Sequence, residues 1–301
     1  MIFIMDVSII IVNYNTKQLT NACIDSVIKY TSNLNYEIIL VDNASSDGSQ
    51  ELFRSRKDII FIESNVNLGF GRGNNLGVNN AKGNFLFFLN SDTLIIENSI
   101  FYLYNFFKKN EAQLQIGALG CKLIDAEFNI MNSGGGFPKV INDLKEYYYA
   151  IMQQIFKVTF SPRDSYDFSS PFFEVDYVIG ADLLMRKSIY DSLGGFDEFF
   201  FMYYEESDLQ FRLTEKGLKC YITTETQIIH LEGGSTNSGS PSNFKRITNQ
   251  VSRNYYFKKN DSKMYFLYVV SDFLLNFTRI FNKNYTTREN FDFVYKNIKS
   301  Y

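Results

Sequence analysis

The first 120 residues alternate apolar runs with amphipathic segments, and this alternation constrains the fold more than any other feature of the sequence. Residues 7–13 and 37–41 are apolar and rich in β-branched side chains, without the polar alternation of a half-exposed strand. Between them, residues 16–29 carry apolar side chains near helical spacing, after Thr16, a residue type that caps helices. Such strand–helix repetition predicts an α/β fold built on a mostly parallel, doubly wound sheet.

The same two patterns recur along the rest of the chain. We expect further strands over residues 59–63, 84–89 and 175–185, and further helices over residues 47–56, 73–82, 98–109, 145–156 and 205–216. Residues 125–175 are otherwise irregular. The segment GGSTNSGSPS, residues 233–242, has the strongest loop composition in the chain. It marks a boundary between a main domain, residues 1–240, and a helical C-terminal extension, residues 241–301.

The chain contains one histidine, His230, and three widely spaced cysteines. A single histidine excludes metal sites that need two or three, so a metal would be held chiefly by carboxylates, which favours Mg²⁺ or Mn²⁺ over Zn²⁺. The cysteines form neither a Cys-x-x-Cys site nor a dense disulfide framework, which indicates a reducing compartment. The apolar amino-terminal run lacks the basic flank and cleavage site of a signal peptide, and it is too short to span a bilayer.

Charge is unevenly divided along the chain. Residues 245–301 contain 11 Lys and Arg against 4 Asp and Glu, whereas the remaining 244 residues contain 19 against 29. Within this basic, aromatic tail, residues 265–281 are apolar but place Asp272, Asn276 and Arg279 at helical spacing, which predicts an amphipathic helix rather than a membrane span. Two interpretations stay open: the tail lies on an anionic membrane surface, or its apolar face packs on the main domain or on a second copy of the chain.

Polar residues follow the predicted strands directly, at the edge where α/β sheets bind ligands. Asp42 suits either a hydrogen bond to a base or ribose or the capping of a turn. Asp92 suits either a divalent cation that bridges two phosphates or a helix cap. The glycine-rich stretch 67–75 precedes a helix and contains Arg72, as an anion site requires, but it matches neither the dinucleotide fingerprint nor the P-loop.

Residues 194–209 form the densest acidic and aromatic cluster, and Glu205, Glu206 and Asp208 open the predicted helix. Acidic side chains at that position favour the helix macrodipole, which explains at least one of the three. Desolvation by the surrounding rings would raise the pKa of another toward the value that a general base needs. His230 ends a predicted strand, where a lone histidine is more often packed or hydrogen-bonded than a ligand.

Six motifs follow one another along the chain: VSIIIVNYN, VDNASSDGS, NLGFGRGNN, LNSDT, GGFDEFFFMYYEESDL and IIHLEGGS. In this order and spacing they resemble the family 2 inverting glycosyltransferases, particularly the rhamnosyltransferase-like branch that builds bacterial surface polysaccharides. The resemblance covers roughly residues 6–260. It implies a nucleotide-diphospho-sugar transferase (A-type glycosyltransferase) fold. It also implies sugar transfer from a dTDP- or UDP-sugar donor to a hydroxyl of a glycan or lipid-linked acceptor, with Mn²⁺ or Mg²⁺ as cofactor.

The resemblance also implies roles for individual residues on the donor side. Asp42 would contact the donor base. Side chains or backbone of three neighbouring residues would line the base pocket, namely Asn13, Tyr14 and Asn15, and two more would lie near the nucleotide, namely Arg72 and Asn75. Asn90-Ser91-Asp92 stands in the place of the family's Asp-x-Asp-like motif, so Asn90 would approach the ribose and Asp92 the metal. His230 matches a histidine that the family often places near the metal and diphosphate.

On the acceptor side, Glu206 occupies the general-base position, where the family usually has an Asp. Glu205 and Asp208 therefore remain alternatives for the base. Residues 1–240 would form the catalytic domain, and acceptor contacts would lie in residues 125–175.

Two functions from different classes follow. The first is an inverting, metal-dependent glycosyltransferase, and the alternative is a catalytically silent sugar-nucleotide or glycan-binding module of an assembly complex. A nucleotidyltransferase ranks third, because the glycine-rich loop after the first strand is absent. We expect a cytoplasmic protein without a nucleic-acid partner, with its tail on the inner face of the plasma membrane in the first interpretation of that tail.

Overall fold

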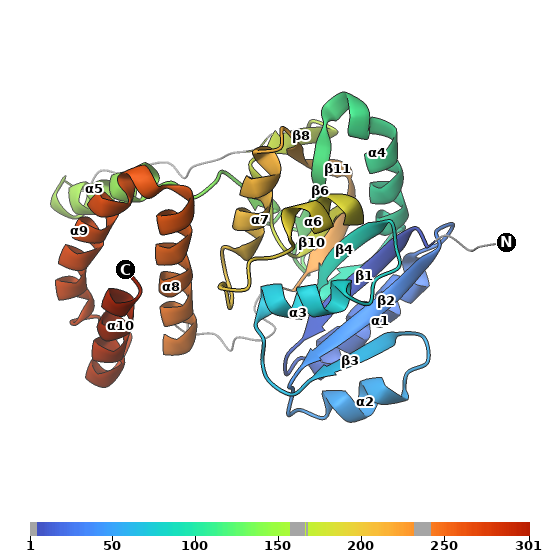
Figure 1. Ribbon diagram of the computed structural model, residues 1–301, viewed down its shortest axis with the longest axis horizontal. Coiled ribbons are helices and arrows are strands. Elements are labelled where there is room, and N and C mark those ends of the chain that lie inside the picture. The colour runs from blue at the N-terminus through green and yellow to red at the C-terminus, as the bar shows by residue number, and fades with distance from the viewer. Residues whose placement is uncertain (1–4, 157–165, 167, 232–241) are drawn as a thin grey trace. The chain divides into compact units, whose positions relative to one another are not determined.

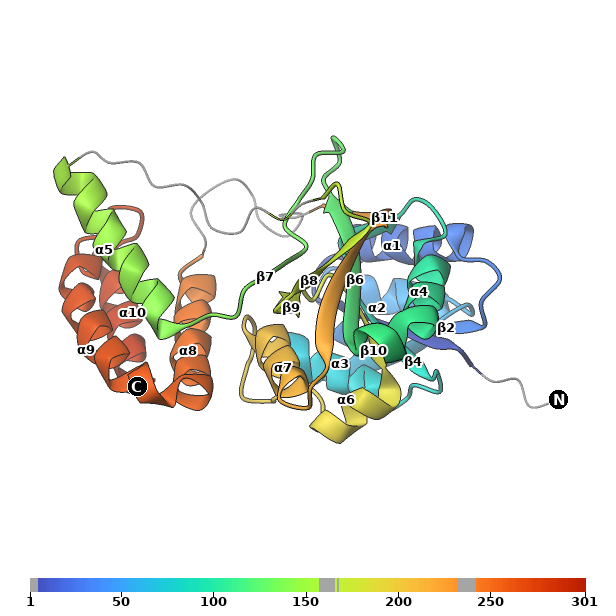
Figure 2. The ribbon, with the colours of Figure 1, turned by 90° about the horizontal axis from the view of Figure 1, so that it is seen from above.

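The computed structural model describes residues 5–156, 166, 168–231 and 242–301, and the chain divides into two compact units. The first comprises the described residues of Met1–Gly136, Tyr166–Phe201 and Glu205–Asn237, and the second comprises those of Phe137–Ser165, Met202–Tyr204 and Ser238–Tyr301. Figures 1 and 2 show that the first unit is α/β and the second is helical.

The first unit is built around one large sheet. Among the described residues its strands follow the order β3-β2-β1-β4-β10-β6-β11-β5, with β8 paired to β11. Their bounds are β1 Val7–Asn13, β2 Tyr36–Asn43, β3 Ile60–Ser64, β4 Phe85–Asn90, β5 Thr93–Ile95, β6 Ile116–Ile124, β8 Phe172–Val175, β10 Asp182–Arg186 and β11 Lys219–His230. Strands β3, β2, β1, β4, β6 and β11 point in one direction, whereas β5, β8 and β10 run against their neighbours. The mostly parallel sheet is therefore confirmed.

Helices cover both faces of this sheet. In β4, Phe85, Phe87 and Leu89 lie in one apolar cluster, whereas Leu86 and Phe88 lie in the other. The first cluster includes side chains of α1 (Lys17–Tyr30), α2 (Ser49–Ser55) and α4 (Ser99–Leu114), and the second includes side chains of α3 (Phe70–Val78), α6 (Lys187–Leu193) and α7 (Glu205–Thr214). Burial on both faces explains why the strands lack polar alternation, and it confirms the doubly wound arrangement.

The strand predicted over residues 175–185 is wrong in one respect. The chain instead ends β8 in the large sheet, forms β9 (Tyr177–Val178), and then returns to the large sheet as β10. Strand β9 pairs with β7 (Gly134–Gly135) in a separate two-stranded sheet. An apolar run indicates burial, but it does not reveal a change of sheet, because the pairing partners are distant in the sequence.

All three cysteines, Cys23, Cys121 and Cys220, are buried and free. Burial raises the pKa of each thiol, so the reactive thiolate is suppressed and these side chains serve as small core residues.

The described part of the second unit contains the helices α5 (Val140–Phe156), α8 (Asn243–Asn260), α9 (Ser262–Arg279) and α10 (Thr287–Lys299). Helix α5 was predicted over residues 145–156, but neither charge nor loop composition grouped it with the tail. Most of the predicted boundary loop, residues 233–242, lies outside the described residues. In the described part of the chain, no helix is both long and apolar enough to cross a membrane.

Candidate functional site

The carboxyl ends of the parallel strands bring several predicted site residues to one edge of the large sheet. Strand β1 ends at Asn13, β4 at Asn90 and β11 at His230. Residues 215–218 join the end of α7 directly to the start of β11, and α7 packs on β11. The start of α7 lies near the carboxyl edge of the sheet. Asn43, the last residue of β2, donates to the carbonyl oxygen of Gly69 just before α3, and a Cβ on Gly71 of α3 would lie 3.6 Å from Glu205 Cβ.

Asn13 is a buried hub that joins the loops after β1 and β2. Its Nδ2 donates to Asp42 Oδ1 at 2.7 Å and to Ser45 Oγ at 3.0 Å. Its Oδ1 accepts from the hydroxyls of Thr16 at 2.9 Å and Thr20 at 2.8 Å. The side chain of Asn13 therefore shapes the loop, whereas Tyr14 and Asn15, the other two members of the predicted base pocket, are exposed.

Asp42 is buried, and its carboxylate holds the same two loops together. Besides Asn13, it accepts from Ser45 N–H at 3.0 Å and from Gln50 Nε2 at 3.1 Å, both at Oδ2. A carboxylate offers about four acceptor positions, so three partners leave room for one more donor. Asn15 also links the two loops, because its Oδ1 accepts a hydrogen bond from Ser46 N–H at 2.7 Å. The contact between Asp42 and a donor base stays a prediction.

Asp92 and His230 meet where β4 and β11 end. His230 Nε2 lies 3.3 Å from Asp92 Oδ1. The backbone fixes the pair, because Leu231 N–H donates to Asp92 O at 2.8 Å and His230 pairs with Thr93 across β5 and β11. Ser91 Oγ lies 3.1 Å from Thr16 Oγ1, which links this corner to the Asn13 hub. The structure thus brings together the two predicted metal ligands, which are 138 positions apart in the chain.

The donor atoms at this corner fit a divalent cation that arrives with its substrate. Asp92 and His230 offer one oxygen and one nitrogen, and the described residues contain no cluster of three or more His, Cys, Asp or Glu side chains that could hold a metal. Mg²⁺ and similar cations commonly keep waters and bind phosphate oxygens with only one or two protein ligands. A pair of this kind matches that requirement better than it matches a permanent structural site.

Arg72 and Asn75 hold the loop before α7. Arg72 Nε donates to the carbonyl oxygen of Glu198 at 2.6 Å. Asn75 Nδ2 donates to the carbonyl oxygen of Phe196 at 2.9 Å, and its Oδ1 accepts from Phe196 N–H at 3.1 Å. The structure therefore brings these two side chains to residues 196–198 and not to the Asp92–His230 pair, and their place near a nucleotide stays a prediction.

The glycine-rich stretch before α3 serves close backbone packing. Gly69 has a φ of +81°, and a Cβ there would lie 2.0 Å from the carbonyl oxygen of Phe201. That same carbonyl accepts from Phe70 N–H at 2.9 Å, at the first residue of α3. Only glycine permits this approach. The sequence suggested that an anion binds at the N-terminus of α3. One backbone N–H group of that terminus is instead bound by the carbonyl oxygen of Phe201.

The three acidic residues of the first turn of α7 differ in their surroundings. Asp208 is buried and paired with Arg212, whose Nε lies 2.9 Å from Asp208 Oδ2 and whose terminal nitrogens donate to carbonyl oxygens of the loop after α6. Glu205 is buried, with its Cβ near Gly71 of α3. Asp208 therefore has a structural partner that accounts for its charge, in line with the stabilising use of acids at helix starts.

Glu206 has the properties expected of a general base. Its Oε2 is buried and has no hydrogen-bond partner among the described residues, and burial raises the pKa of this carboxyl. Tyr203 and Tyr204 directly before α7 both have positive φ values, 72° and 71°, which non-glycine residues seldom adopt. Such strained backbone concentrates at functional sites.

Asp182 is a residue at this edge that the sequence analysis missed. It starts β10 opposite Leu89 of β4, is fully buried, and accepts from Cys121 N–H at 2.6 Å through Oδ2. Its Oδ1 has no hydrogen-bond partner in the described part of the chain. Burial raises its pKa to about 7, although hydrogen bonding with Cys121 opposes that rise. The signal available in the sequence was an acid two residues after Gly180 within an apolar run.

Asp182→Asn should stabilise the protein at pH 8 but not at pH 4. In the folded protein the Asp182 carboxyl stays protonated to about pH 7, whereas in the unfolded chain it ionises near 3.8. The folded state therefore loses stability as the pH rises from about 4 to 7, and the amide avoids that loss of about 2–4 kcal/mol. Urea unfolding at both pH values measures the difference. Equal destabilisation at pH 4 and pH 8 would show that burial of this carboxyl costs nothing.

Residues 8–194 match the family model described as "Glycosyl transferase family 2". The chain is 35% identical over 121 residues to a poly(ribitol-phosphate) beta-glucosyltransferase of Bacillus spizizenii, which covers 38% of this chain and 19% of the relative. It is 25% identical over 240 residues to the O-antigen biosynthesis protein RfbC of Myxococcus xanthus, which covers 76% of this chain and 17% of the relative. The chain thus spans less than a fifth of either relative.

The chain also resembles a solved structure in its fold. The mannosyltransferase PcManGT of Pyrobaculum calidifontis, solved with GDP-Man and Mn²⁺, matches with a TM-score of 0.57 at 15% identity, over 86% of this chain and 64% of its own. At this identity the likeness concerns the fold, and it confirms the A-type glycosyltransferase fold with C-terminal helices that the motifs predicted.

Proposed function

The chain belongs to glycosyl transferase family 2, and from this premise we propose that it transfers a sugar from a nucleotide-diphospho-sugar to a hydroxyl group of a surface glycan. The proposal is supported by two separate features at the carboxyl edge of the sheet, one suited to donor binding and one suited to proton transfer. Asp92 and His230 lie 3.3 Å apart, which suits two ligands of one cation, while Glu206 in the first turn of α7 has a buried carboxylate oxygen with no hydrogen-bond partner among the described residues. A binding module needs the first feature but has no use for the second.

The proposed reaction is a single displacement. Glu206 takes the proton of the acceptor hydroxyl as that oxygen attacks the anomeric carbon. The bond from that carbon to the diphosphate oxygen breaks as the new bond forms, so the configuration inverts without a covalent enzyme intermediate. A divalent cation held by Asp92 and His230 would stabilise the charge on the departing nucleoside diphosphate.

The finer identity of the substrates is part of the proposal. Resemblance to the rhamnosyltransferase-like branch favours a dTDP-deoxyhexose donor, UDP-hexoses are the second class, and the solved mannosyltransferase adds GDP-hexoses. The printed names of the bacterial relatives point to O-antigen or poly(ribitol-phosphate) chains as acceptors. We propose a glycan or lipid-linked acceptor of this kind.

A donor screen tests the proposed activity. The purified chain is incubated with dTDP-, UDP- and GDP-sugars in Mn²⁺, Mg²⁺ or EDTA, and both thermal shift and release of nucleoside diphosphate are recorded. We expect one donor class to stabilise the protein and to be consumed only with a divalent cation. Binding without turnover, even with a panel of glycan acceptors, would favour the silent binding module. The absence of both donor binding and donor turnover would contradict the proposal.

His230→Ala should weaken metal-dependent donor binding at least tenfold and leave the fold intact. Loss of a residue that merely orients a ligand already costs about 10–100-fold in metal affinity, and a ligand should cost no less. Titration calorimetry in Mn²⁺ measures the change, and the same titration in EDTA is the control, in which the two proteins should bind alike. A variant that matches the wild type in Mn²⁺ would make His230 a packed residue only.

A further inference from the structure

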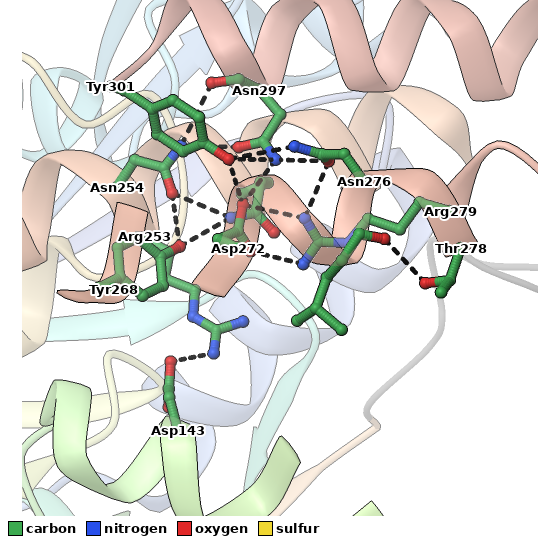
Figure 3. Close-up of polar contacts among 12 residues, drawn as sticks. Asp143, Arg253, Asn254, Tyr268, Asp272, Asn276, Thr278, Arg279, Asn297 and Tyr301 are labelled. Atoms are coloured by element: carbon green, nitrogen blue, oxygen red, sulfur yellow. Dashed lines mark hydrogen bonds and ion pairs between the residues drawn. The ribbon is translucent and has the colours of Figure 1, made fainter. Parts of the chain in front are cut away.

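Helix α9 has its polar face inside the second unit. Asp272 is fully buried, and its carboxylate accepts from Arg279 at 2.6 Å, from Asn297 Nδ2 at 2.7 Å and from the Tyr301 hydroxyl at 2.7 Å. Asn276 joins the same network through Asn297, 2.9 Å away. Figure 3 shows these side chains converging between the helices. The polar stripe that the sequence predicted for this helix is therefore the packed one.

The opposite face of α9 is apolar and exposed. We call it the α9 stripe, and it consists of Phe266, Leu267, Val270, Phe273, Leu274, Phe277 and Phe281. These residues recur at intervals of three and four, as one side of a helix requires. Phe266 is 78% exposed and Phe281, just past the helix end, is 79% exposed. Soluble proteins seldom expose a continuous apolar surface unless it binds something.

The described residues of the second unit leave this stripe exposed. Helix α9 packs on α5, α8 and α10, and its buried residues Tyr268, Asp272 and Asn276 lie on the other side of the helix. Figure 3 shows the ion pair of Asp272 and Arg279 on that buried side. Turning the helix to hide its phenylalanines would bring this ion pair into water and break the hydrogen bonds that Asp272 and Asn276 make with α10 and Tyr301, so the interior fixes the exposed orientation.

The exposed charged side chains of residues 243–301 are mostly positive. Residues 243–301 contain the exposed cations Lys258, Lys259, Lys263, Lys283, Arg288, Lys296 and Lys299. Lys263 lies on the stripe itself, three residues before Phe266. The acidic side chains of the same segment are all engaged: Asp272 with Arg279, Asp261 with Val140 N–H, Glu289 in the cap of α10 and Asp292 with Lys296. The exposed surface of residues 243–301 thus combines aromatic side chains with an excess of positive charge.

We propose that the α9 stripe binds an anionic lipid bilayer, with its phenylalanines in the interface and Lys263 and the neighbouring cations among the headgroups. Bulky apolar side chains on one face with flanking lysines are the features of interfacial helices. A negatively charged leaflet complements this surface, whereas a second copy of the chain would bring like charges together. The inference does not depend on sugar transfer, although it would bring the site near a lipid-linked acceptor.

Vesicle flotation of the full chain, without sugar donor, tests the proposal. We expect binding to phosphatidylcholine vesicles that contain 30% phosphatidylglycerol, little binding to phosphatidylcholine alone, and loss of binding at 0.5 M salt. Phe277→Ser should weaken binding about tenfold. Phe128→Ser is the matched control, because Phe128 of the first unit is 63% exposed and Phe277 is 61% exposed, and this variant should bind like the wild type.

Three results would overturn the proposal. The first is no binding of the wild type to anionic vesicles at low salt. The second is equal weakening by Phe277→Ser and Phe128→Ser, which would separate binding from the stripe. The third is a dimer in sedimentation that Phe277→Ser dissociates, without vesicle binding, which would assign the stripe to a second copy. Because no donor is present, each result leaves the proposed transferase activity untouched.

Discussion

Glu206→Gln should reduce sugar transfer by about 10²–10⁴-fold while donor binding in Mn²⁺ stays close to that of the wild type. The amide keeps the size of the side chain but cannot take a proton from the acceptor hydroxyl. Burial raises the pKa of Glu206, and its Oε2 has no hydrogen-bond partner among the described residues. Turnover and donor affinity, measured on the same preparation, separate loss of a base from loss of a fold.

The pH profile of transfer adds a second readout for the same residue. Burial raises the pKa of Glu206 above the usual 4.5, so the wild type should lose turnover on the acidic side at a pH above that value. The residual activity of Glu206→Gln should lack this limb. A wild-type profile without an acidic limb would contradict the assignment.

The other two acids of the cluster supply matched controls. Asp208→Asn breaks the ion pair with Arg212 and should lower thermal stability more than turnover per folded molecule. Glu205→Gln should retain most of the turnover. If either of these variants loses transfer as expected for Glu206→Gln, and Glu206→Gln does not, the base belongs to that residue.

Arg279→Ala should destabilise the second unit by about 3–5 kcal/mol, because it leaves the Asp272 carboxylate buried without its charged partner. Arg279 makes two hydrogen bonds to Asp272, at 2.6 and 2.9 Å, and the two side chains are 17% and 0% exposed. Partnership with Arg279 also lowers the pKa of Asp272 despite its burial. Hydrogen exchange of α8, α9 and α10 reports on this unit by itself, and it should speed up strongly in the variant.

Arg54→Ala is the matched control for that prediction. Arg54 makes the same two-pronged contact with Glu63, at 2.8 and 2.9 Å, but its side chain is 59% exposed and that of Glu63 is 33% exposed. Exposed pairs contribute about 0–1 kcal/mol, so exchange in the first unit should hardly change. Similar effects of both substitutions would show that burial does not determine the strength of the Arg279 ion pair.

The sequence was most informative where burial alone decides the structure. The runs that became β1, β2 and β4 lack polar alternation because helices cover both faces of the sheet, and this is visible in the residues themselves. The entry of β10 between β4 and β6 was not predictable, because it depends on pairing partners far away in the chain. Asp182 was missed for the same reason, since only that pairing brings it to the site.

The site and the C-terminal tail show a second limit of prediction from the sequence. Spacing placed Arg72 and Asn75 on an exposed loop–helix junction, but their partners, the backbone of Phe196 and Glu198, are more than 120 positions away. In α9 the sequence revealed two faces but not which one packs inward. That choice depends on Asn297 and Tyr301, which reach Asp272 from the far end of the tail. A local sequence pattern shows which residues share one face of a helix. Residues far away in the chain determine which face packs inward.

The measurement that most directly tests the central claim is a calorimetric titration of the donor identified by the screen into three proteins in the presence of Mn²⁺. The wild type and Glu206→Gln should bind it with similar affinity, and Asp92→Asn should bind it at least tenfold more weakly. This pattern would separate a donor site at Asp92 and His230 from a base at Glu206. Equal binding by all three proteins, or loss of binding in Glu206→Gln alone, would contradict the account.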